Sequence, residues 1–182
     1  MRKQLFVVAT LATLSFSVVA QERPPQSKSV ADSINLIWKS VAQEFTALAE
    51  AMPEDKWGFK PTQGAFSNVR TFAEQVKHVA CANEAWAKKV KKEKTPERCD
   101  LGGPNPAKSK AEILAYLRQS VQLMDQAIAS TNASNVVEPL AGDYWGDTRL
   151  AALSAALWHI SDHYGQLVEY ARMNGVVPPA SQ

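Results

Sequence analysis

The three histidines are the residues whose type and spacing point to chemistry. His159 and His163 are four positions apart, so on a helix they share one side and lie about 6 Å apart along the axis. His78 is the only other histidine in the chain. Neutral imidazoles bind divalent metals, and three protein ligands leave a position open for water or substrate, as in catalytic zinc sites. All three histidines fit one such site.

Four segments of the chain have the apolar periodicity of amphipathic helices, and no segment has convincing strand-like alternation. Thr71-Phe72-Ala73-Glu74 and Ser109-Lys110-Ala111-Glu112 are capping-box patterns that begin the second and third of these helices. Pro53 ends the first, and Gly175 followed by two prolines ends the fourth. The sequence therefore predicts an all-α four-helix bundle with helices at about residues 30–51, 71–92, 109–128 and 148–174.

The helical projection places each histidine beside an apolar face. In the fourth helix, His159 and His163 share a sector with small or aromatic residues, next to the expected core arc of Leu150, Leu153, Leu157, Ile160, Tyr164, Leu167 and Val168. The residues sharing that sector are Ala152, Ala156 and Tyr170, and His78 is similarly flanked by Ala82 and Ala85. Pairs at this spacing also occur by chance, and a single histidine at such a boundary is commonly structural. Periodicity alone leaves open whether the second and fourth helices converge.

The first twenty residues have the anatomy of a secretory signal peptide. Arg2 and Lys3 precede an apolar stretch, and small residues lead to a cleavage site after Ala20. We expect a signal peptide at 1–20, a polar lead-in at 21–28 and the bundle at 29–182, with export to the periplasm. No later stretch approaches the length needed to span a membrane. Removing the leader leaves 18 basic and 18 acidic residues, and a neutral chain without a basic arm argues against nucleic-acid binding.

The chain has two cysteines, Cys81 and Cys99, and whether they form a disulfide depends on the compartment. In an oxidising compartment disulfides persist, and the chain between these cysteines can turn back to join them. We therefore predict a Cys81–Cys99 disulfide, with a buried and inert Cys81 as the alternative. The spacing matches neither a zinc ribbon nor a redox motif.

The sequence resembles the DinB-like (DinB/YfiT) superfamily over nearly all of the expected mature chain. The similarity is strongest in the segment from Phe72 to Ala80, which contains His78, and in the segment from Trp158 to Tyr170, which contains the other two histidines. The residues from Arg172 to Pro179 also resemble the end of family members. The resemblance implies a four-helix bundle in which His78, His159 and His163 bind a divalent metal, with zinc or nickel as the candidates. It also implies that a homodimer is a common assembly.

The characterised branches of this family include thiol-dependent S-transferases and a thiol-dependent isomerase. The resemblance therefore implies a metal-dependent hydrolase or thiol transferase acting on a small-molecule substrate. The alternative is a non-catalytic metal-binding, small-molecule-binding or dimeric structural module. Tyr170 and Gln166 are the candidate catalytic residues, whereas Tyr164 is expected to be a buried aromatic residue. Tyr144 and Trp145 would either cover the site or plug the bundle.

Overall fold

The structure is a computed structural model that describes residues 28–141 and 146–182. The expected leader at 1–20, nearly all of the lead-in, and Tyr144 and Trp145 lie outside the described residues. The predicted four-helix architecture is confirmed, and no strand occurs in the described part of the chain. None of the helices described is long and apolar enough to cross a membrane. The helices are α1 (Val30–Ala51), η1 (Glu54–Lys56), α2 (Phe72–Val90), η2 (Cys99–Leu101), α3 (Lys110–Ala129), α4 (Arg149–Met173) and η3 (Pro179–Ser181).

Capping explains where the first three long helices begin. The hydroxyls of Thr71 and Ser109 accept hydrogen bonds from the third residue of their helices, and Glu74 and Glu112 accept hydrogen bonds from the cap backbone in return. These two predicted capping boxes are confirmed, and Ser29 makes a third with Asp32 at the start of α1. Such pairs satisfy backbone N–H groups that have no partner within the helix.

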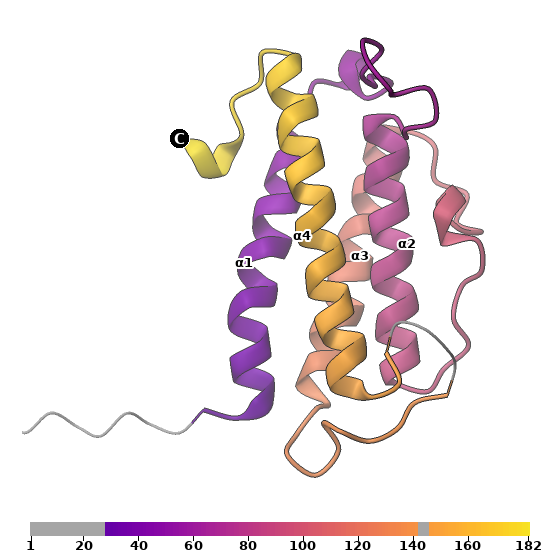
Figure 1. Cartoon of the computed structure of the whole chain (residues 1–182), viewed down its shortest axis with the longest axis vertical. Coiled ribbons are helices and arrows are strands. Elements are labelled where there is room, and N and C mark those ends of the chain that lie inside the picture. The colour runs from indigo at the N-terminus through magenta and orange to yellow at the C-terminus, as the bar shows by residue number, and fades with distance from the viewer. Residues whose placement is uncertain (1–27, 142–145) are drawn as a thin grey trace, which may run out of the picture.

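The long helices run up, down, down and up in chain order (Figure 1). Tyr116 of α3 donates a hydrogen bond to Glu84 of α2. Further along both helices, Lys91 at the end of α2 donates a hydrogen bond to Gln126 near the end of α3. These two helices are therefore parallel neighbours. Two parallel helices that follow one another need a connection as long as the bundle. Residues 91–109 make that connection, and η2 lies within it (Figure 1).

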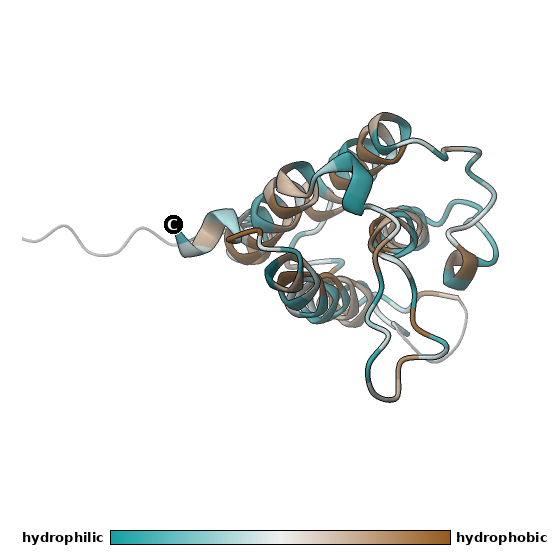
Figure 2. Cartoon of the chain, turned by 90° about the horizontal axis from the view of Figure 1, so that it is seen from above, coloured by the Kyte–Doolittle hydropathy of each residue, from teal (hydrophilic) through white to brown (hydrophobic). Residues whose placement is uncertain are grey.

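The core lies where the apolar faces of the four helices meet. Each helix carries apolar and polar residues around its circumference, as the end-on view shows (Figure 2), and amphipathic helices bury the apolar side. The largest side chains buried completely come from all four helices: Trp38, Phe45, Leu48, Phe72, Val76, Leu117, Met124, Ile128, Leu153, Ile160 and Leu167. The parallel and the antiparallel helix pairs therefore pack around one continuous apolar core.

The buried side of α4 is rotated from the arc that periodicity predicts. Leu150 was expected in the core and is instead 43% exposed, while Ala152, Ala156 and Tyr170, expected at its edge, are buried. Small alanine side chains allow close approach of neighbouring backbones, so the alanine side of α4 packs inward together with Leu153 and Leu167, and Leu150 is left at the surface. This rotation turns the histidine sector toward α2.

Candidate metal centre

Antiparallel packing of α2 against α4 brings the three histidines together. His78 lies in the second turn of α2, and His159 and His163 lie on successive turns near the middle of α4. The Nε2 atom of His159 is 3.0 Å from Nε2 of His78 and 3.1 Å from Nε2 of His163. One ligating nitrogen from each ring lies within 4.8 Å of the others. For comparison, Zn–N bonds in a tetrahedral site place two nitrogens about 3.3 Å apart.

The hydrogen-bonding capacity of the rings fits a cation at their centre. Nδ1 of His78 lies 2.6 Å from the backbone oxygen of Cys99, which can only accept, so Nδ1 carries the proton in the neutral ring. Nε2 of His78 then presents a lone pair toward His159. With neutral rings, a single N–H at His159 cannot make both short contacts, whereas a divalent ion accepts lone pairs from all three nitrogens.

Burial keeps the cluster neutral. It lowers the pKa of His159 to about 3, with further lowering from charge on His163 and His78. Burial also lowers the pKa of His163 to about 4, and charge on His78 adds to this effect. The pKa of His78 is lowered by burial as well, although the hydrogen bond to Cys99 opposes that shift. Neutral imidazoles are the form that binds metals.

The family comparison agrees with this geometry. A model of the DinB superfamily matches residues 37–167, which is more than half of the chain and includes all three histidines. The chain belongs to the DinB superfamily. No curated protein matches it.

Two features of this DinB superfamily chain border the histidines. The indole of Trp86 packs edge-on against the ring of His159, with 5.0 Å between ring centroids. Arg70 is close enough that its charge lowers the pKa of all three histidines, after the larger effect of burial. Arg70 also lines a cavity of about 400 Å³ together with Glu74 and Asp100. A cationic group therefore lies beside the cluster and next to a polar cavity.

The two candidate catalytic residues lie near the cluster but have structural contacts. Tyr170 is 7% exposed, and its hydroxyl donates a hydrogen bond to the backbone oxygen of Arg70 over 3.2 Å. The Gln166 amide accepts from Gln75 at 2.7 Å and donates to Asp162 at 2.8 Å. The aromatic ring of Tyr164 is partly buried against the core, near its predicted place. These hydrogen bonds give Tyr170 and Gln166 structural roles in the residues around the histidines.

The structure joins Cys81 of α2 and Cys99 of η2 in a disulfide. Sequence reasoning did not connect this pair with the histidines. It also overlooked Arg70 and the Cys99 carbonyl. A backbone carbonyl leaves no signature in a sequence, and Arg70 lies in an irregular loop whose position follows from tertiary packing. The unusual feature that sequence did offer was a cysteine three residues after a candidate ligand.

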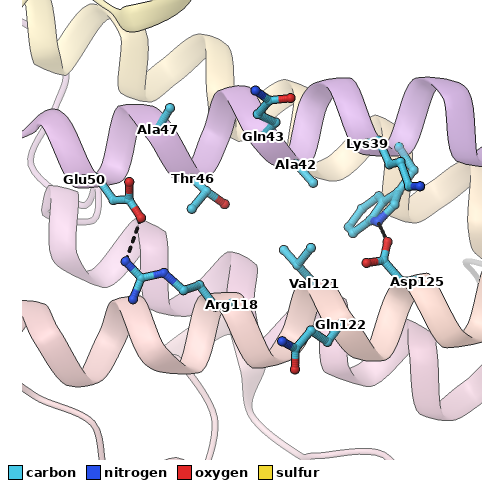
Figure 3. Close-up of a pocket in the computed structure, with 11 residues that line it drawn as sticks. Lys39, Ala42, Gln43, Thr46, Ala47, Glu50, Arg118, Val121, Gln122 and Asp125 are labelled. Atoms are coloured by element: carbon cyan, nitrogen blue, oxygen red, sulfur yellow. Dashed lines mark hydrogen bonds and ion pairs between the residues drawn. The ribbon is translucent and has the colours of Figure 1, made fainter.

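A second cavity of about 660 Å³ lies between α1 and α3 and is lined by none of the histidines (Figure 3). The indole N–H of Trp38 donates to Asp125 across the helix pair at 2.9 Å. Glu50 and Arg118 form an ion pair at 2.6 Å near its other end (Figure 3). Between these two polar contacts, small side chains such as Ala42 and Ala47 line the α1 wall. The cavity therefore results from small residues between two cross-linked ends.

Proposed function

We propose that this DinB superfamily member binds one divalent metal ion through His78, His159 and His163, and that it is a metal-dependent hydrolase or thiol transferase. The observation that carries the proposal is the approach of His159 Nε2 to within 3.0 and 3.1 Å of the other two Nε2 atoms. Three imidazole ligands suit zinc or nickel. They also leave coordination positions for another ligand.

The residues around the site have separable roles in this proposal. When bound, the metal supplies Lewis acidity, which lowers the pKa of a water or a thiol at the open position. The histidines are held neutral by burial, so they are available as ligands at neutral pH. Trp86 limits the rotation of the His159 ring by packing against it. Arg70 places a cationic group beside the histidines, in a cavity that it shares with Glu74 and Asp100, so this side of the site suits a polar small-molecule substrate.

The cellular setting is part of the same proposal. Disulfides persist in oxidising compartments, so the Cys81–Cys99 bridge supports export to the periplasm after removal of residues 1–20. The balanced charge of residues 21–182 supports a role without nucleic acid. We expect a homodimer from the family resemblance, and size-exclusion chromatography with light scattering measures this directly.

Elemental analysis of protein produced without a polyhistidine tag tests the site. We expect close to one zinc or nickel ion per chain in the wild type and a large loss in His78→Ala and in His159→Ala. Gln122→Ala, in the cavity between α1 and α3, is the matched control and should retain the metal. Wild-type protein that takes up no stoichiometric metal after incubation with zinc and nickel salts would contradict the proposal.

A non-catalytic binding module is the second candidate, and the burial of the ligands favours it. His78 is only 9% exposed and His163 only 7% exposed, so access to an ion between them is restricted. Cobalt-substituted protein distinguishes the two functions. A change in its visible spectrum on addition of azide or a small thiol supports an open catalytic position, whereas an unchanged spectrum supports the structural alternative.

A further inference from the structure

The backbone oxygen of Cys99 determines how His78 faces the other histidines. It accepts a hydrogen bond from His78 Nδ1 at 2.6 Å and one from the Gly102 N–H at 2.9 Å. With the proton fixed on Nδ1, Nε2 keeps the lone pair that points toward His159. By contrast, Nδ1 of His159 and Nδ1 of His163 are buried without a hydrogen-bond partner. Of the three rings, His78 is thus the one whose tautomer is fixed by a protein group.

The segment that supplies this oxygen has a conformation that needs to be held in place. Arg98 has a left-handed backbone with φ of 58°, and Gly102 and Gly103 have φ of 82° and 70°. A non-glycine residue is strained in this region because its Cβ lies too close to the following carbonyl oxygen. The Arg70 side chain donates two hydrogen bonds to the backbone oxygen of Asp100, at 3.1 and 2.8 Å. The segment η2 is anchored by these two hydrogen bonds and, covalently, by its disulfide to α2.

The disulfide attaches η2 to the face of α2 that carries His78. Cys81 follows His78 by three positions and is completely buried, so the two side chains are neighbours on the helix. The close fit at the bridge involves Gly103, where an added Cβ would overlap Cys81 Sγ. The bridge therefore fixes the height of η2 along α2, and with it the distance between the Cys99 oxygen and the His78 ring.

We propose that the Cys81–Cys99 disulfide is a positioning element of the metal centre, and that it makes metal affinity depend on the thiol redox state. The inference rests on the proposed metal site. Reduction by a dithiol or a phosphine transfers two electrons to the S–S bond, and two protons from solvent or reductant complete the two thiols. The dithiol becomes a disulfide and the phosphine a phosphine oxide, with water as the oxygen source. Released from Cys81, η2 no longer holds its carbonyl at His78, and the imidazole then populates both tautomers.

Metal affinity in a double-mutant cycle tests the coupling. Loss of a group that orients a ligating histidine typically weakens metal binding 10–100-fold, and we expect that loss for zinc in Cys81→Ser/Cys99→Ser. The affinity is measured by competition with a chromophoric chelator, and circular dichroism verifies folding. In a His78→Ala background, the same serine substitutions should change residual affinity less than threefold. Equal affinity in the wild type and the serine variant, or equal losses in both backgrounds, would overturn the inference.

Nitrogen NMR of the histidine rings provides a test that needs no metal and no substitution. Metal-free oxidised wild type should show His78 with its proton on Nδ1, and reduction with a phosphine should produce a mixture of tautomers. An oxidised protein with the proton on Nε2, or a reduced protein with an unchanged tautomer, would overturn the inference. Failure of the metal proposal is seen separately, as wild-type protein that binds no zinc or nickel.

Discussion

The Nε2 atom of His159 lies 3.1 Å from the Nε2 atom of His163, one helical turn further along α4. Burial lowers the pKa of both rings, to about 3 and about 4, whereas an unfolded histidine has a pKa of about 6.5. Between these values the unfolded chain binds protons that the folded chain does not. The metal-free protein must therefore lose stability as the pH falls below about 6.5.

The first prediction concerns this pH dependence. In the presence of chelator, the free energy of unfolding of the wild type should fall between pH 6.5 and pH 4.5. Each neutral buried histidine contributes at most about 1.4 kcal/mol per pH unit. His159→Gln removes one such group, so its curve should be shallower by up to that amount. Urea denaturation at several pH values measures both curves, and parallel curves would contradict the depressed pKa of His159.

The second prediction concerns the amide pair beside the cluster. Gln75 is 2% exposed and donates to the Gln166 oxygen across the α2–α4 contact at 2.7 Å. Removing one partner leaves the other buried polar group without a hydrogen bond, which lowers the free energy of unfolding by about 1–3 kcal/mol. Replacing both partners lowers it less. We expect Gln166→Leu to lower the free energy of unfolding by that amount and Gln75→Leu/Gln166→Leu to lower it less.

Chemical denaturation of the two variants and the wild type measures these differences. A double variant that is less stable than Gln166→Leu would show that the Gln75 side chain contributes chiefly through packing. Metal affinity measured on the same proteins separates a positioning role of Gln166 from a catalytic role. A residue that positions His163 affects the metal affinity, whereas a residue that acts only on the substrate leaves it unchanged.

Local sequence signals predicted the elements of this fold because helix formation depends on nearby residues. Periodicity and the capping boxes at Thr71 and Ser109 placed the long helices within two residues of their observed bounds. The rotation of α4 was not predicted correctly, because alanines give little hydrophobic contrast and leucines biased the projection. In α1 as well, an apolar residue of the periodic segment, Ile37, is 57% exposed.

The site depends on relations that no local pattern contains. Spacing placed His159 and His163 on one side of a helix, but the approach of His78 depends on antiparallel packing of α2 and α4. The family resemblance supplied that convergence. The Cys99 oxygen reaches His78 because the parallel α2 and α3 require a long connection along the bundle. Neither topology nor a backbone acceptor can be deduced from residue type.

The third prediction concerns the disulfide itself. Denatured, unreduced protein should contain no titratable thiol, because Cys81 and Cys99 are joined. The bridge closes the loop from Cys81 to Cys99. In the chain-entropy account, closing a loop of that length stabilises a protein by about 3 kcal/mol. Cys81→Ser/Cys99→Ser should lose about that much, as measured by urea denaturation. Two thiols per chain in the first assay would contradict the bridge and the redox coupling built on it.

The fourth prediction concerns the polar contact that joins α1 to α3. Trp38 is completely buried, and its indole N–H has the Asp125 carboxylate as an acceptor at 2.9 Å (Figure 3). Asp125→Ala leaves that donor without its acceptor and should lower the free energy of unfolding by about 1–3 kcal/mol. Asp125→Asn keeps an oxygen at the same place and should lose less than half of that amount. Thermal and urea denaturation provide the comparison, with Gln122→Ala as the surface control on the same helix. Equal losses in the alanine and asparagine variants would show that the charge of Asp125, rather than its hydrogen bond to Trp38, stabilises the helix pair.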